Sequence, residues 1–132
     1  MLARHHPCSS LDVSRDHRKL HVFVLADDLV TRIYRATHGF PVAERFGLQA
    51  QLRRAAVSAA CNIVEGSARR STREYVNFLN VAAGSASEAR YLVAISCRLG
   101  FLTDADEQTL TASYTELVAR MNALMQALSR EP

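Results

Sequence analysis

The chain has 132 residues, enough for one domain with a buried core, and 48% of them are hydrophobic. Aromatic residues make up only 7%, and there are five Gly and three Pro, a balance that favours helix and argues against an all-β fold. The formal net charge is +3, with eleven Lys or Arg against six Asp or Glu in residues 1–70 and five against seven in residues 71–132. The basic first half is mild evidence for a polyanionic partner.

The sequence gives no sign of secretion or membrane insertion. Residues 1–15 are polar and irregular and lack the apolar segment of a secretory signal, so we expect a frayed tail. No stretch approaches the roughly 20 apolar residues of a membrane span. The Cys residues form no C-x-x-C pair, and Cys61 and Cys97 lie in apolar stretches where buried, reduced thiols are expected. We therefore expect a cytoplasmic protein.

Hydrophobic periodicity divides the rest of the chain into long helices. We predict four of them, over residues 16–38, 48–66, 71–99 and 103–129. The first repeats apolar residues at helical spacing and stops at Gly39, with Pro41 beyond it. The connector that follows carries Phe40 and Phe46, which we expect to plug one end of the fold.

Local signals also mark the ends of the later helices. Gly66 is a natural residue to follow the second helix, and Ser71 with Glu74 matches the S-x-x-E capping box that begins the third. Gly100 ends the third helix. Gly84 lies in its middle among small residues, which would let a neighbouring helix approach closely.

The fourth helix carries the clearest seam. Its apolar residues alternate steps of four and three, and most other positions are polar: Leu110, Tyr114, Leu117, Met121, Leu124 and Leu128. Short connections between long helices force antiparallel neighbours. The prediction is an all-α, antiparallel up-down-up-down four-helix bundle over residues 16–130.

The second helix predicts self-association. Between residues 55 and 64 it is apolar on nearly every face, whereas a bundle helix needs only one apolar stripe. An uncovered apolar face usually marks an interface, and here it would comprise Val57, Ala60, Cys61 and Val64. The alternative is a monomer in which the first helix and the connector cover this face.

The sequence offers no catalytic constellation. Catalytic helix bundles often carry Glu-x-x-His motifs on two helices, and this chain has none, with no His after His38. His17 and His21 are one helical turn apart but lack a third ligand. No Gly-rich phosphate loop is present. We therefore predict a protein that is not an enzyme and needs no metal or cofactor.

Polar residues gather at the corner between the second and third helices. One interpretation is a structural network that joins Asn62, Glu65 and Glu74 to arginines and backbone amides. The other is an anion site built on arginines and the third helix's N-terminus, with Arg69, Arg70 and Arg73. Arg53 and Arg54 point about 100° apart on the second helix, so at most one can face the core.

Several short segments, in this order and spacing, carry a family resemblance. They are Gln51 to Ser58, Asn62 to Gly66, Arg70-Ser71, Glu74-Tyr75, Phe78-Leu79, Ala83-Gly84-Ser85 and Leu99 to Leu102. Over about residues 17–128 the chain resembles the small bacterial four-helix-bundle proteins first noticed as products of intervening sequences in large-subunit rRNA genes. The accessory variability proteins of diversity-generating retroelements look like relatives of that family.

The resemblance implies a cyclic homopentamer with a central channel and no enzymatic activity. It also implies nucleic-acid binding through a basic surface, which carried over to this chain would comprise Arg53, Arg54, Arg69, Arg70 and Arg73. Two functions follow as hypotheses. The first is an oligomeric protein that binds RNA or a ribonucleoprotein, and the second is a protein–protein adaptor that makes no nucleic-acid contact.

Overall fold

The computed structural model describes residues 17–130, and the expected tail at residues 1–15 lies outside them. Its elements, in chain order, are α2 (His17–Thr37), the short 3-10 helix η1 (Val42–Glu44), α3 (Leu48–Ser67), α4 (Thr72–Arg98) and α5 (Asp104–Ser129). Each long helix begins and ends within one residue of the bounds expected from the sequence.

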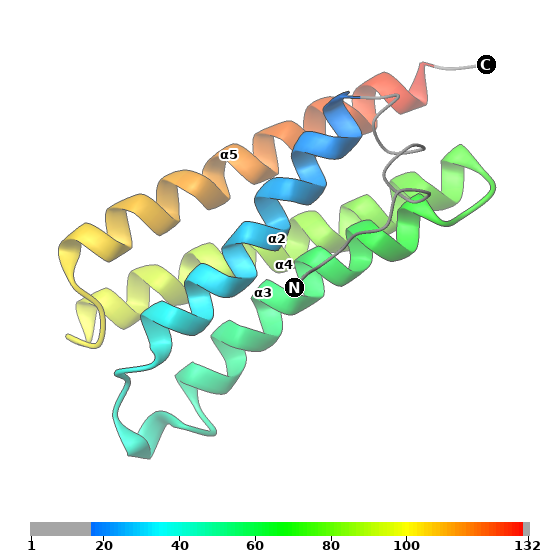
Figure 1. The fold of residues 1–132 in the computed structure, drawn as a ribbon. Coiled ribbons are helices and arrows are strands. Elements are labelled where there is room, and N and C mark those ends of the chain that lie inside the picture. Colours follow the sequence, from blue (N-terminus) through cyan, green and yellow to red (C-terminus); the bar gives the residue numbers. More distant parts are fainter. Residues whose placement is uncertain (1–16, 131–132) are drawn as a thin grey trace, which may run out of the picture.

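The four long helices form a bundle in which each packs against two neighbours. Backbone contacts join α2 to α3, α3 to α4, α4 to α5 and α5 back to α2, and within residues 17–130 no such backbone contact crosses a diagonal. Consecutive helices run in opposite directions along the bundle (Figure 1). The predicted all-α four-helix bundle is confirmed.

The core is one apolar cluster with contributions from all four helices. All six residues of the predicted α5 seam are buried. On α3 the inward stripe consists mostly of the small residues alanine and glycine, which lets its neighbours approach closely: Leu52, Ala55, Ala56, Ala59, Ile63 and Gly66. The inner faces of the helices therefore match the periodicity of the sequence.

Side-chain caps begin α4 and α5. The Ser71 hydroxyl accepts a hydrogen bond from the Glu74 amide at 3.1 Å, as the capping box predicts. The Thr103 hydroxyl accepts one from the Asp106 amide at 3.1 Å. Each cap satisfies an amide that the first helical turn leaves without a partner.

Gly100 ends α4 in the left-handed region, with φ of 83°. Its amide donates to the Cys97 carbonyl, and the Phe101 amide donates to the Ser96 carbonyl, each at 2.9 Å. This pair of bonds is a Schellman motif, which only a residue at positive φ can close without strain. The chain changes direction here, and the centroid of the Phe101 ring then lies 5.7 Å from the centroid of the Phe40 ring.

Several expectations about individual side chains are wrong. Phe40 plugs the end of the bundle as expected, but Phe46 is 89% exposed, because the chain turns from η1 into α3 beyond the edge of the core. Cys61 is exposed and Cys97 is partly exposed, since both lie off the inward stripes of their helices. The small residues around Gly84 do let α3 approach, since the Ser85 hydroxyl lies 2.9 Å from that of Ser58, but Gly84 itself is exposed and a Cβ there would meet nothing within 4 Å.

Gly66 does not follow α3 but lies inside its last turn, where it is buried. A Cβ added there would lie 2.7 Å from the Phe78 Cβ and 2.9 Å from the Tyr75 Cδ1. Real Cβ atoms essentially never come so close to a neighbour. The glycine therefore serves the contact between α3 and α4 rather than the helix end.

Candidate nucleic-acid interface

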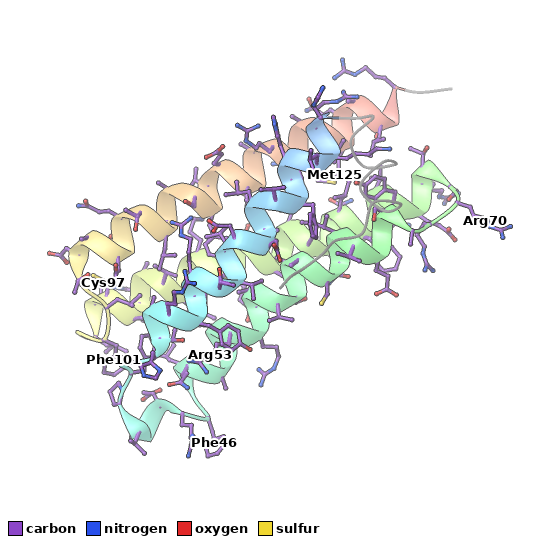
Figure 2. All side chains as sticks on the ribbon, viewed as in Figure 1. Phe46, Arg53, Arg70, Cys97, Phe101 and Met125 are labelled. Carbon is purple, nitrogen blue, oxygen red and sulfur yellow. The ribbon has the colours of Figure 1, made fainter. Side chains whose placement is uncertain are left out.

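The five arginines singled out from the sequence fall into two groups at opposite ends of α3. Arg53 and Arg54 lie near its start, whereas Arg69, Arg70 and Arg73 lie at the corner between α3 and α4. At 1.5 Å per residue, the sixteen residues from Arg53 to Arg69 span about 24 Å. Figure 2 shows Arg53 and Arg70 toward opposite ends of the molecule. The structure thus brings together the members of each group but not the two groups.

At the corner, all three arginines are exposed. The Arg69 guanidinium lies 5.6 Å from the centroid of the Phe78 ring, which holds one cation against the surface of α4. The N-terminus of α4, capped by Ser71, adds its positive dipole end to the same place. The corner therefore presents three cations, while the positive end of the α4 dipole is opposed there by the negative end of the α3 dipole.

The bundle adds further cations that the sequence did not reveal as neighbours. Because the helices alternate in direction, the start of α2 and the end of α5 lie at the same end as the corner (Figure 1). The Lys19 ammonium lies 5.4 Å from the centroid of the Tyr75 ring on α4. We call this surface the basic end, and its residues are Arg18, Lys19, Arg69, Arg70, Arg73 and Arg130.

Only two acidic residues accompany the corner. Glu65 and Glu74 were expected to join Asn62 in a structural network, but both are exposed.

Asn62 instead donates to the backbone carbonyl of Ser58 at 2.8 Å and to the Ser58 hydroxyl at 3.2 Å. The Ser58 hydroxyl lies 2.9 Å from that of Ser85, which ties α3 to α4 near their middles. The expected network is thus absent from the described corner, because Ile63 and Gly66 face the core and turn Glu65 outward.

At the start of α3, one arginine is fixed and the other is free to reach solvent. The Arg53 Nε donates to the Thr37 hydroxyl at 2.8 Å, and its Nη2 donates to the Tyr34 carbonyl at 3.3 Å. Its guanidinium lies 4.4 Å from the centroid of the Tyr34 ring. Arg54 is exposed, so only one of the pair turns toward the bundle, as predicted.

These arginines border a hollow of about 480 Å³ between the end of α2, the connector and the start of α3. We call it the arginine–aromatic hollow. It is lined by Tyr34, Arg45, Phe46, Gln49, Ala50, Arg53, Arg54 and Val57. No carboxylate is among these residues, so the hollow is positive and partly aromatic.

The predicted interface residues of α3 form a partly uncovered apolar strip. Val57 and Ala60 are half-buried, Cys61 is exposed, and Val64 is 50% exposed. The neighbouring helices cover one side of α3 and leave this strip in contact with solvent. We call these four residues the α3 apolar strip.

A second concavity lies between α4 and α5 at the basic end. Its volume is about 680 Å³, and it is lined by Val76, Asn80, Asn122, Met125, Gln126, Ser129 and Arg130. Its polar lining is mostly amide and hydroxyl, with one cation. This composition suits hydrogen bonding to a polar ligand and provides no nucleophile–base pair for catalysis.

Comparison with models of known protein families identifies the family of this chain. The model of the family described as 23S rRNA-intervening sequence protein matches residues 18–123. The chain belongs to this family. The match covers α2 apart from its first residue, all of α3 and α4 and most of α5, so family membership applies to the bundle as a whole and confirms the resemblance found in the sequence.

A solved structure shows the same fold. It is the crystal structure of a protein of unknown function from the S23 ribosomal protein family of Bacteroides thetaiotaomicron, with a TM-score of 0.77. Sequence identity is 20%, and the alignment covers 83% of this chain and 98% of the other. At this identity the likeness establishes the bundle fold alone. No curated protein matches the chain.

Two side chains of this intervening-sequence family member have perturbed acidity. Burial raises the pKa of Tyr114 well above its usual range. A hydrogen bond from the Cys97 thiol to Asp104, 3.3 Å long, raises the pKa of that thiol. Both shifts favour the protonated, unreactive form, which is the opposite of what activates a nucleophile.

Metal and membrane features complete the description of the surface. Across residues 17–130, His, Cys, Asp and Glu side chains form no group of three that could hold a metal ion. His17 and His21, one turn apart, have ring centroids 6.5 Å apart. Within the described part of the chain, no helix combines the length and the apolar composition needed to cross a membrane.

Proposed function

We propose that this protein is a non-catalytic, oligomeric bundle that binds RNA or a ribonucleoprotein through its basic end. The observation that carries this proposal is the gathering of six cationic side chains from three separate parts of the chain at one end of the bundle. Three of them, Arg69, Arg70 and Arg73, are exposed on a single corner.

Arginine suits this role for a physical reason. Its planar guanidinium contacts phosphate oxygens with two parallel hydrogen bonds, and it keeps its charge at any physiological pH. Each phosphate that it neutralises releases condensed counterions, which gives an affinity that falls steeply with salt. The exposed corner leaves the three guanidinium groups accessible to a strand's backbone.

We also propose that the protein assembles with itself, as the family resemblance implies, into a cyclic pentamer. The α3 apolar strip supports self-association, because an apolar surface of this kind is stabilised when a second copy removes it from water. A ring would repeat the basic end by symmetry and raise the avidity of each complex for a long polyanion. Five copies of the 14.6 kDa chain give a mass of about 73 kDa.

The mass in solution tests the assembly. Size-exclusion chromatography with light scattering should give the mass of a closed ring, and Val64→Asp should lower it, because a charge in an apolar interface is costly. Val81→Asp is a matched control, since Val81 is 54% exposed on α4, outside the strip. A clean 14.6 kDa monomer of the wild-type chain would sink the proposed assembly.

RNA binding is tested by fluorescence anisotropy with total RNA at about 50 and 200 mM salt. The variant Arg69→Ala/Arg70→Ala/Arg73→Ala should bind more weakly, and its slope of log K against log salt should be shallower by about 2, at roughly 0.7 per lost phosphate contact with single strands. A variant that removes the same charge away from the basic end, Arg35→Ala/Arg90→Ala/Arg98→Ala, should keep both the affinity and the slope. Unchanged binding by the corner variant would remove the basic end as the site.

The second candidate is a protein–protein adaptor that contacts no nucleic acid. The exposed apolar residues of the connector favour it, since Val42 and Phe46 are 86% and 89% exposed. This function predicts no RNA binding by the wild-type protein even at low salt. The same anisotropy measurement therefore separates the two candidates.

A further inference from the structure

The most exposed large apolar side chain in the described structure lies at the edge of a positive hollow. Phe46 is 89% exposed and lies two residues before the start of α3, and it helps to line the arginine–aromatic hollow. Figure 2 shows it at the outer edge of the connector, away from the core. Because the core leaves this ring in water, the fold itself gives no packing reason for an aromatic residue there.

The charged side chains that line the hollow beside Phe46 all have one sign, and the carboxylate of nearby Glu44, which is not among the lining residues, accepts a hydrogen bond from the Leu48 amide at 3.0 Å. Arg45, Arg53 and Arg54 line the hollow, and no carboxylate does. The Arg45 guanidinium lies 6.0 Å from the centroid of the Phe46 ring. Arg53 is held by its bonds to α2, which use two of the five N–H donors of a guanidinium. Arg45 and Arg54 are exposed, so their donors face solvent.

A ligand that fits must be anionic and have a flat apolar face. Aromatic rings interleaved with arginines are the usual means by which proteins hold unpaired nucleotides, since every base has a π-face that can stack. The volume of about 480 Å³ lies within the range of small-molecule sites, roughly 300–1,000 Å³. We propose that the arginine–aromatic hollow binds one nucleotide unit, with its base stacked on Phe46 and its phosphate held by Arg45 and Arg54.

The nucleotide unit has two possible sources, a free nucleotide and an unpaired position in an RNA strand. A base inside a duplex is stacked on its neighbours and cannot reach the Phe46 ring. The inference deepens the proposed function and rests on it, because an unpaired RNA segment would occupy both the hollow and the basic end. It requires that the hollow stay open in the assembled protein.

The absence of tryptophan from the sequence makes a direct optical test possible. Phe46→Trp would introduce the only tryptophan of the chain, at the proposed stacking position. Its fluorescence should be quenched by AMP, by a single-stranded oligoadenylate, or by both, and not by a fully paired RNA duplex. Val42→Trp, at a site 86% exposed on the same connector but outside the hollow, is the control and should show no saturable quenching.

Affinity measured on the full chain by calorimetry or anisotropy tests the individual contacts. Phe46→Ala should weaken binding of the nucleotide or single strand by between about fivefold and a hundredfold, the usual effect of removing one stacked ring. Arg54→Ala should weaken it and reduce its salt dependence. Val42→Ala should bind like the wild type. If AMP binds, the hollow takes free nucleotides; if only the oligoadenylate binds, it takes unpaired RNA.

Three results would overturn the inference. They are no binding of either probe to the wild-type protein, equal binding by Phe46→Ala, or a lower oligomeric mass for Phe46→Ala, which would make the hollow a contact between copies. Failure here is distinguishable from failure of the proposed function. If only the corner variant loses RNA binding, the basic end is supported as the RNA site and the hollow is not. If only Phe46→Ala loses RNA binding, the hollow is supported and the basic end is not.

Discussion

Replacing Gly66 by alanine tests the closest approach of two helices in the bundle. The new Cβ would lie 2.7 Å from the Phe78 Cβ, about 0.7 Å inside the 3.4 Å at which ordinary contact begins. A Cβ is fixed to its backbone, so no rotation of the Phe78 side chain relieves the clash. Only a separation of α3 from α4 does, and that separation loosens the core on both sides.

The expected cost follows from two opposing effects. Overpacking of this kind costs about 1–3 kcal/mol. Alanine recovers up to about 1 kcal/mol of helix propensity, and less than that here because Gly66 lies in the last turn of α3. We therefore expect Gly66→Ala to lower the free energy of unfolding by about 1–2 kcal/mol. For a chain of this size that corresponds to a fall in Tm of roughly 4–8 °C.

Gly84→Ala is the matched control. It lies inside α4, and its new Cβ would meet nothing within 4 Å. We expect it to raise the free energy of unfolding by about 0.5–1 kcal/mol through helix propensity alone. Urea unfolding followed by far-UV circular dichroism, at one fixed protein concentration, measures both variants. If Gly66→Ala were as stable as Gly84→Ala, the close contact between α3 and α4 would be refuted.

Three further predictions concern buried hydroxyls, caps and thiols. The Tyr114 hydroxyl is buried without a hydrogen-bond partner, so Tyr114→Phe should leave stability unchanged or raise it slightly in the same unfolding assay, and a loss above about 1 kcal/mol would reveal a partner. Ser71→Ala removes the cap of α4 and should cost about 1 kcal/mol, whereas Ser71→Asp should retain most of it. Iodoacetamide should alkylate Cys97 slowly even at mildly alkaline pH, because the hydrogen bond to Asp104 raises the pKa of the Cys97 thiol and keeps it protonated as pH rises. Asp104→Ala should speed Cys97 alkylation, and peptide mass spectrometry would show whether it does.

Stretches of sequence a few residues long were enough to predict the helices. The S-x-x-E box at Ser71 and the glycine at position 100 act on backbone groups within one turn, so their effect does not depend on the rest of the fold. The seam of α5 is likewise a property of spacing, and all of its residues are buried. Family membership follows from the same sequence segments.

The candidate site was only partly predictable. The grouping of the corner arginines was foreseen, as was the inward turn of at most one of Arg53 and Arg54, because both follow from positions close together in the sequence. The exposure of Phe46 was not, since its burial depends on where the connector leaves the core. The network expected around Glu65 failed for a similar reason, because the partners available to a side chain depend on which neighbouring helix it meets.

By itself, the sequence determined where each helix begins and ends, which stripe of each helix is apolar, and that the helices alternate in direction. Tertiary structure alone decided which charges share a surface. Lys19 and Arg130 reach the basic end from positions at least fifty residues away from the corner in the sequence, because antiparallel packing brings the start of α2 and the end of α5 to that end (Figure 1). It also decided that Gly66 serves a helix contact, since a glycine's sequence context does not reveal what a Cβ would meet.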